Sequence, residues 1–189
     1  MGKTLGIIVF LILFLSCIKK SKEEQFVVSL TKEFKLKNGV LFYNEEAYTG
    51  VLLSFDKVNK TNNTSEYKEG KKHGKELKKY QNEVLAEERF YTKGNKSGVH
   101  KGWWKNGGLK FEYHFNTTGE YHGIVREWYK NGQPCKFFNY EEGKEKGSQQ
   151  MWQPNGKLRA NYIVKNGDRF GLIGLKKCYT VNTIDEKIN

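Results

Sequence analysis

The chain has 189 residues, enough for one domain, and lysine and arginine outnumber aspartate and glutamate by 33 to 21, which gives a formal net charge of +12. Only 37% of the residues are hydrophobic, and aromatic residues supply much of that share. This composition disfavours a thick globular core and favours an open sheet.

The N-terminus has the features of an export signal. Lys3 gives a positive start, residues 5–15 are almost all apolar, and Ser16 and Cys17 precede a charged stretch. Such a run is too short to span a bilayer and predicts a secretory signal peptide over residues 1–16. A cysteine directly after a small residue resembles the lipobox of bacterial lipoproteins. That resemblance implies acylation of Cys17, with a plain signal peptide or a retained signal anchor as alternatives.

The lipobox resemblance also implies a location. A lipoprotein is exported and anchored to the cell membrane through its lipid, facing the periplasm or the cell surface. Isoleucine follows Cys17, and by the usual sorting rule a Gram-negative cell sends such a protein to the outer membrane. Residues 17–39 are rich in lysine and glutamate, which predicts a tether. Its one apolar patch, residues 26–30, adds either an edge strand or a short helix.

Glycine then recurs at a fixed spacing of 24, 24, 25, 24 and 24 residues, at Gly50, Gly74, Gly98, Gly123, Gly147 and Gly171. A second series runs in step with the first: Gly70, Gly94, Gly119, Gly143 and Gly167. A period of this length predicts a repeat architecture. We expect the glycines of the first series to mark turns, and therefore to report a requirement of backbone shape.

Each repeat reads as one β-hairpin. In the unit that starts at Gly98, Asn106-Gly107 predicts a type I′ turn, and the polar segment 92–98 predicts the other turn. Between the turns, Phe111 and Tyr113 alternate with polar residues, as expected for strands. About five such hairpins predict an all-β, elongated, single-layer antiparallel meander over residues 40–175, followed by an irregular tail, 176–189.

A second aromatic series lies five residues after the glycines. It comprises Phe55, Trp103, Trp128 and Trp152, with Lys79 interrupting it. Aromatic residues in the same register of neighbouring hairpins are expected to stack across strands. Trp103, Trp128 and Trp152 then either pack within the thin sheet or form a binding face for sugar rings or lipid.

The repeat unit resembles a known family. The pattern from Tyr91 to Leu109, Tyr-x-x-Gly-x-x-x-Gly followed by an aromatic pair and Asn-Gly-x-Leu, is similar to the MORN-repeat variant of bacterial proteins often labelled as antitoxins. The resemblance covers residues 40–175. It is specific for the repeat and does not assign a function. With the export signal, the leading hypothesis is a non-enzymatic scaffold that binds an unknown protein partner at the envelope. A glycan- or phospholipid-binding module and an antitoxin component are the alternatives.

Little in the chain suggests catalysis. Cys135 and Cys178 lie almost two repeats apart, too far for a disulfide in a regular ribbon. His73 and His122 precede repeat glycines and read as turn residues, without zinc-ligand spacing. We therefore expect no enzyme activity, no metal and no cofactor. The lysines are scattered through turns of an exported chain, which makes nucleic acid an unlikely partner and leaves anionic lipid, glycan or an acidic protein.

Overall fold

The computed structural model describes residues 25–28 and 33–174, which form fifteen strands in two sheets and contain no helix. The small sheet contains β2 (Phe34–Lys37), β3 (Val40–Tyr43) and β4 (Glu46–Ala47). The main sheet contains β1 (Gln25–Val28), β5 (Gly50–Asp56), β6 (Thr61–Lys68), β7 (Lys71–Tyr80), β8 (Leu85–Thr92), β9 (Asn95–Trp103), β10 (Leu109–Phe115), β11 (Tyr121–Trp128), β12 (Pro134–Glu141), β13 (Lys144–Trp152), β14 (Leu158–Lys165) and β15 (Asp168–Leu172).

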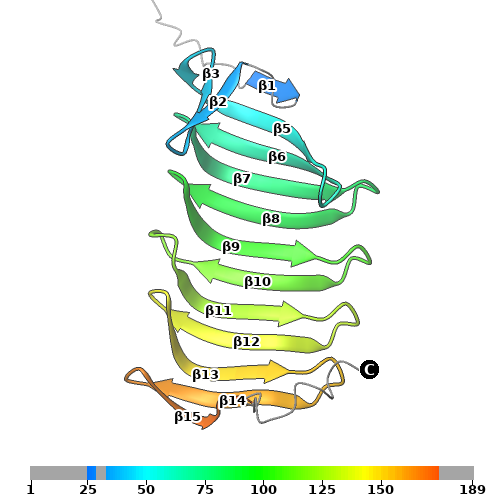
Figure 1. Ribbon diagram of the computed structural model, residues 1–189, viewed down its shortest axis with the longest axis vertical. Helices are drawn as coiled ribbons and strands as arrows, with labels where there is room; N and C mark the ends of the chain where they lie inside the picture. Colours follow the sequence, from blue (N-terminus) through cyan, green and yellow to red (C-terminus); the bar gives the residue numbers. More distant parts are fainter. Residues whose placement is uncertain (1–24, 29–32, 175–189) are drawn as a thin grey trace, which may run out of the picture.

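The main sheet is an open meander. From β5 to β15 each strand pairs antiparallel with the next in sequence, and β1 adds to the edge in parallel with β5. Figure 1 shows this order as an elongated sheet with the chain passing back and forth across it. The predicted all-β meander of hairpins is confirmed. Residues 26–28 of the predicted apolar patch lie in β1, an edge strand and one of the two expected forms, while residues 29–30 are outside the described residues.

The two ends of the hairpins use different turns. At one end, Glu69-Gly70, Lys93-Gly94, Glu142-Gly143 and Asn166-Gly167 each have two successive positive φ angles, which defines type I′ turns. At the other end, Gly107 N donates to the Trp104 backbone oxygen at 2.8 Å, and Trp104 N donates to Gly108 O at 2.8 Å. This is a three-residue loop in which only Gly107 is left-handed. The predicted hairpin at Asn106-Gly107 is present, but its predicted type I′ geometry is wrong.

The glycines of the first series do not mark turns, which corrects the sequence prediction. Gly74, Gly98, Gly123 and Gly147 lie inside β7, β9, β11 and β13, all with positive φ. Gly50 begins β5 and Gly171 lies within β15. At Gly74, Gly98, Gly123 and Gly147 the pairing register shifts, as between Tyr113↔Val125 and Phe115↔Tyr121, whereas it stays regular at Gly50 and Gly171. The four interior glycines therefore mark β-bulges, which bend strands.

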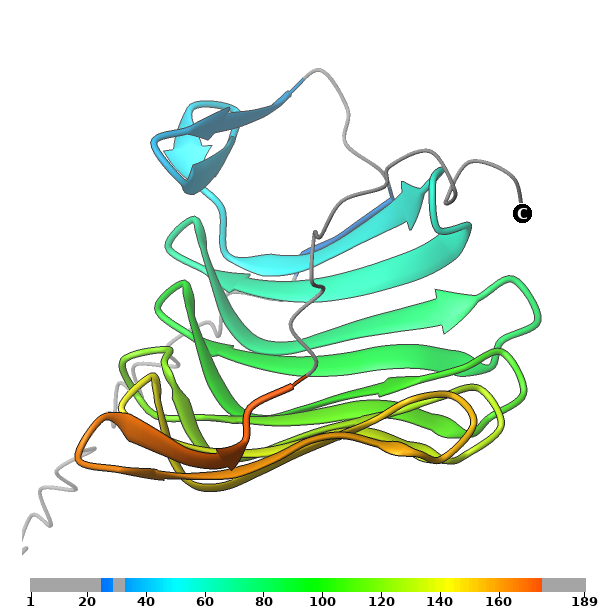
Figure 2. The same ribbon diagram turned by 60° about the horizontal axis from the view of Figure 1, so that its bottom comes forward.

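The bulges give the sheet a concave side. Figure 2 shows the strands curving towards the side where β2–β4 lie. We call this side the inner face. It carries the residue two positions after each of the first five glycines, and all five of these residues are buried: Leu52, Glu76, His100, Val125 and Gln149. We call these five residues the inner column.

At the end of the sheet opposite the type I′ turns, a second bulge follows each three-residue loop. Trp103 pairs with Leu109, but Gly102 pairs with Phe111, so Lys110 is an extra residue on its strand. The equivalent residues in the other repeats are Ala86, Cys135 and Arg159. Cross-strand partners point to the same face of a sheet, so one extra residue moves the side chains that precede it on its strand to the opposite face. Leu109 therefore lies with Trp103 on the outer face, although strict alternation along the strand would place it with Phe111.

The single 25-residue spacing lies in a turn, as the sequence predicted. Asn116 N donates to Glu120 O at 3.0 Å, and Gly119 N donates to Asn116 O at 3.2 Å. A three-residue loop thus replaces the type I′ turn at this one hairpin. Because the extra residue is absorbed there, the aromatic residues on both sides keep their faces.

The small sheet packs on the inner face at the N-terminal end. Phe34, Leu41, Tyr48 and Leu52 form one core cluster, joined by Tyr67. Leu41 N donates to Gly70 O at 2.8 Å, and Gly70 N donates to Tyr48 O at 2.7 Å. The predicted tether over residues 17–39 therefore includes folded chain at β1 and from Phe34 onward, and the repeats begin at β5.

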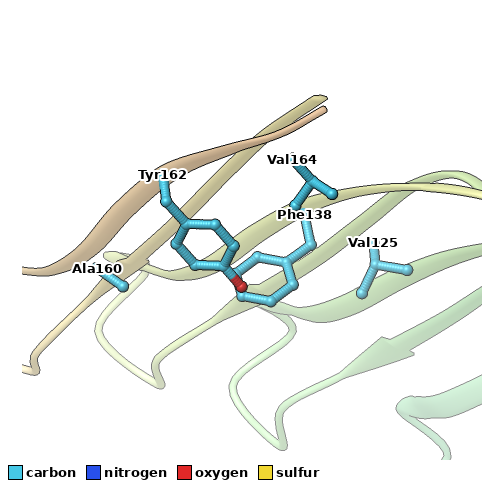
Figure 3. Packing of buried hydrophobic residues seen from close by; sticks show 5 residues of the cluster. All are labelled: Val125, Phe138, Ala160, Tyr162 and Val164. Carbon is cyan, nitrogen blue, oxygen red and sulfur yellow. The ribbon is translucent and has the colours of Figure 1, made fainter. Parts of the chain in front are cut away.

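A second core lies on the same face towards the C-terminal end. It contains Val125, Phe138, Ala160, Tyr162 and Val164, all buried. The rings of Phe138 and Tyr162 are 6.1 Å apart, and Figure 3 shows them beside each other between Val125 and Ala160. This cluster holds β11 to β14 together by apolar contact on one side of a single sheet.

Candidate binding surfaces

The second and third positions of the inner column, Glu76 and His100, are polar. The Glu76 carboxylate accepts hydrogen bonds from Ser65 Oγ at 3.0 Å and Tyr91 Oη at 3.2 Å, and it pairs with Lys72. Burial raises the pKa of Glu76, but the hydrogen bond and charge of Lys72 outweigh it and leave the pKa below its usual value. A buried carboxylate is tolerated here because it has partners on both oxygens.

His100 occupies the next inner-column position and is 1% exposed. One of its ring nitrogens, Nε2, lies 2.8 Å from Phe90 O. Its ring packs between Tyr91 and Phe115, with centroid distances of 5.6 and 4.5 Å. Burial lowers the pKa of His100, which favours the neutral ring. The residue is part of the packing of the inner face.

From His100 onward the inner face carries a continuous series of rings. Phe115 stacks on Tyr121 at 4.8 Å, and Tyr121 contacts Tyr140 at 5.2 Å. Together with Tyr91 and His100 these residues form what we call the inner aromatic row. β2–β4 cover its N-terminal neighbour Tyr67, and Figure 2 shows no other described strand over the inner face.

Carboxylates hold several inner tyrosines in place. Tyr113 Oη donates to Glu127 at 3.0 Å, and Tyr162 Oη donates to Glu145 at 3.0 Å. Burial and the Glu145 carboxylate raise the pKa of Tyr162 to about 12. Arg169 also contacts Glu145, at 3.0 Å. The inner face thus combines fixed rings with fixed charges of both signs, a surface suited to recognising another polymer.

The outer face carries the tryptophans, but they do not form the predicted continuous ladder. Trp128 contacts Phe137 at 5.7 Å, and Phe137 contacts Trp152 at 5.2 Å, both edge-on. We call these three residues the outer aromatic strip. A whole strand separates successive tryptophans, so they touch only where that strand supplies a ring. Between Trp103 and Trp128 the equivalent of Phe137 is Glu112, which pairs with Lys101 instead.

The outer aromatic strip continues towards the last described strand. Phe137, Gln150, Asn161 and Leu172 are successive cross-strand partners, so Leu172 lies on the same face as Phe137. Next to Leu172 on β15, Phe170 is 57% exposed. Above the strip, the Arg126 guanidinium lies 5.4 Å from the Phe137 ring centroid. The outer face is therefore apolar at its C-terminal end and charged further towards β5.

The remaining candidate residues do not come together. Cys135 is a free thiol at the bulge of β12, while Cys17 and Cys178 lie outside the described residues. His73 Nδ1 accepts from Lys93 N at 3.3 Å at a turn, and His114 pairs with Glu112. Over residues 25–28 and 33–174, no three His, Cys, Asp or Glu side chains are placed to hold a metal ion. The same residues contain no helix able to cross a membrane.

Sequence reasoning missed Glu76 and its partners. A carboxylate in a lysine-rich stretch reads as surface charge, and Glu76 stands between Lys75 and Leu77. Its position in the repeat could have identified Glu76 as buried. It lies two residues after a glycine of the first series, and each residue at that position after Gly50 to Gly147 is buried.

The sequence matches no known protein-family model and no curated protein. The fold itself defines the class: an open antiparallel repeat sheet with a concave face carrying an aromatic row and a convex face carrying an aromatic strip.

Proposed function

We propose that this chain is a non-enzymatic, lipid-anchored scaffold of the MORN-repeat type that binds a protein partner at the bacterial envelope. The observation that carries the proposal is how the small sheet docks. Phe34 and Tyr48 of the same chain pack beside Tyr67 on the inner face. Tyr91, Phe115 and Tyr140 stand at the equivalent positions of the next three repeats, and no described strand covers them. The inner aromatic row therefore extends an existing docking surface.

Repeat sheets of this kind commonly use their concave side for binding, because each repeat adds the same side-chain positions to one long surface. Tyr113, whose hydroxyl donates to Glu127, is a rigid, partly exposed group with a polar tip, the type enriched in protein interfaces. Export and anchoring through Cys17 remain the proposal made from the lipobox.

The partner is tested by photo-cross-linking in cells at two exposed positions. A photoreactive amino acid at Lys96, whose ammonium lies 5.2 Å from the Phe115 ring centroid, samples the inner face. The same amino acid at Asn161 samples the outer face. We expect one discrete protein adduct from position 96 and none from position 161. Adducts from neither position would contradict the scaffold, and a cytoplasmic toxin as adduct would favour the antitoxin role.

The anchor is tested separately, by metabolic labelling with a palmitate analogue. Wild-type protein should carry the label and Cys17→Ala should not. Label that persists in Cys17→Ala would contradict lipidation at this cysteine without bearing on the inner face.

A second candidate, binding of envelope glycan or anionic lipid, is favoured by the outer aromatic strip with Arg126 over Phe137. Exposed aromatic rings stack on sugar rings and enter lipid interfaces. We expect Trp128→Ala with Trp152→Ala to reduce retention on isolated envelope glycan or on vesicles with anionic lipid. Phe55→Ala is the control, because Phe55 is an exposed aromatic residue of β5 at the far end of the sheet from the outer aromatic strip. Unchanged retention in the double variant would remove this candidate.

A further inference from the structure

We infer that a hollow at the three-residue-loop end of the sheet binds a small anionic sugar, a sugar phosphate or a uronate. The hollow has a volume of about 310 Å³ and lies between the β5–β6 loop, β7, β8 and the β9–β10 loop. Its volume is at the low end for small-molecule sites, which suits a single sugar ring. The inference goes beyond the scaffold role, because it uses neither the inner aromatic row nor the outer aromatic strip.

The hollow exists because one repeat departs from the others. Ala86 lines it and is the extra residue of the bulge in β8. The three later repeats place the larger residues Lys110, Cys135 and Arg159 at this position. Alanine leaves open the space that a longer side chain fills, and Lys110 of the next repeat reaches the same hollow.

The charges around the hollow leave two ammonium groups without a carboxylate. Lys78 is neutralised by Glu87 at 2.9 Å. Lys105 lies 5.6 Å from the Tyr80 ring centroid and Lys110 lies 4.7 Å from the Trp104 ring centroid. Neither lysine makes an ion pair in the described part of the chain. An ammonium resting on an exposed ring is weakly held, so a bound anion can recruit both.

The rest of the wall fits a sugar. The Tyr80 ring lines the hollow and is fixed, because its hydroxyl donates to Trp103 O at 2.9 Å. Sugar rings stack on such fixed aromatic faces. Asn59 and Thr61 add an amide and a hydroxyl within the wall. One anionic group between Lys105 and Lys110, with a sugar ring against Tyr80, satisfies all of these groups together.

The test is calorimetric titration of the full chain with glucose 6-phosphate, glucuronate, inorganic phosphate and glucose. We expect the two anionic sugars to bind, phosphate to bind at least about tenfold more weakly, and glucose to give no signal. Lys105→Ala with Lys110→Ala should weaken the anionic sugars by about tenfold or more. Lys130→Ala is the matched control, because Lys130 occupies the same loop position one repeat later and does not line the hollow.

A cavity-filling variant and a vesicle assay complete the test. Ala86→Val fills the hollow without changing charge and should also abolish binding in a chain whose circular dichroism is unchanged. Sedimentation with phosphatidylglycerol vesicles separates a soluble sugar from a lipid headgroup. Equal affinity for phosphate and glucose 6-phosphate, unaltered binding in the double lysine variant, or binding to vesicles alone would each overturn the inference. None of these results bears on cross-linking at the inner aromatic row.

Discussion

The two halves of the inner face bury different chemistry on the same backbone. In the N-terminal half the inner column contains Glu76 and His100, while Val125 takes the equivalent place further on. Leu52 and Gln149, at the two ends of the column, do not follow this division. The neighbouring strands follow the same division, with Ser65 beside Glu76 and Phe138 beside Val125. The repeat therefore fixes which positions are buried, through the bulge glycines and the bend they produce, but leaves open what fills them.

The difference has an energetic consequence. An apolar position gains stability from burial alone, roughly in proportion to the apolar area removed from water. A buried carboxylate contributes only while its partners stay charged and bonded. We therefore expect the apolar cluster around Phe138 to be insensitive to pH and the surroundings of Glu76 to weaken in acid. The following substitutions test this contrast.

Phe138→Ala should have the largest effect. Phe138 is 6% exposed and contacts Tyr162 in the apolar cluster, so its loss leaves a cavity. The expected decrease in the free energy of unfolding is about 3–5 kcal/mol, measured by urea denaturation. Phe170→Ala, at an exposed position of β15, should change it by less than about 0.5 kcal/mol. Similar losses in both variants would show that the cluster is not a core.

Glu76→Gln tests the polar half. At pH 7 it should lower the free energy of unfolding by about 1–3 kcal/mol, because Lys72 loses its charged partner. The folded-state pKa of Glu76 lies below the ordinary 4.5, so its contribution is complete above that value and is lost as pH falls through the folded-state pKa. The difference between wild type and variant should therefore shrink in acid.

Gln149→Glu supplies the reverse experiment. Gln149 is 0% exposed at the equivalent position, and its amide nitrogen donates to Asn139 O at 2.9 Å. A carboxylate there has no cation to match Lys72, so burial should raise its pKa and the variant should gain stability as pH falls. Urea denaturation at pH 4 to 8 compares the two variants. The stability deficit of Gln149→Glu relative to wild type should therefore be largest at pH 8 and shrink as the new carboxylate is protonated. A deficit that stays constant or grows as pH falls would show that a carboxylate at position 149 is not destabilised by burial.

Gly102→Ala probes a close contact between the halves. A Cβ atom at Gly102 would lie 2.1 Å from Phe111 Cε1, so the ring must move. The expected loss is about 1–3 kcal/mol, as for overpacking elsewhere. Because Gly102 does not have a positive φ, the loss is steric, and Phe111→Leu in the same chain should restore part of it. A double-mutant cycle by urea denaturation measures this, and strict additivity would show that the two residues are not in contact.

The sequence predicts the meander well because its period is carried by residues with strict backbone roles. It does not distinguish turn from bulge at Gly98 or Gly123, since glycine supplies positive φ in both settings. The turn type at Asn106-Gly107 fails for the same reason: the pair fits a type I′ turn and also the last two residues of a three-residue loop. The turn residues in the sequence predict where a hairpin lies, but the register of the two paired strands decides which turn type forms.

Other features were missed because they break the period. The small sheet stands before the first repeat, in a stretch whose lysines and glutamates predict a tether, yet Phe34 and Leu41 are buried in it. The hollow beside Ala86 depends on a difference between repeats, which becomes visible only when the bulges are aligned. The outer aromatic strip depends on Phe137, which lies on the strand between those of Trp128 and Trp152. Phe137 is not a member of the tryptophan series, so the spacing of that series could not predict the strip.

The smallest effect isolates the bulge glycines themselves. Gly147 has φ of 71°, and a Cβ atom there would have no atom within 4 Å. Gly147→Ala should therefore cost only the backbone strain of a left-handed residue, about 1–2 kcal/mol, and Gly147→Asn less, since asparagine tolerates this conformation. Gly74→Ala should cost more, because its Cβ would lie 2.0 Å from Glu66 Oε2, which accepts from Lys75 N at 3.0 Å. Urea denaturation ranks the three. Equal losses for alanine and asparagine at Gly147 would show that positive φ is not what the repeat requires of this glycine.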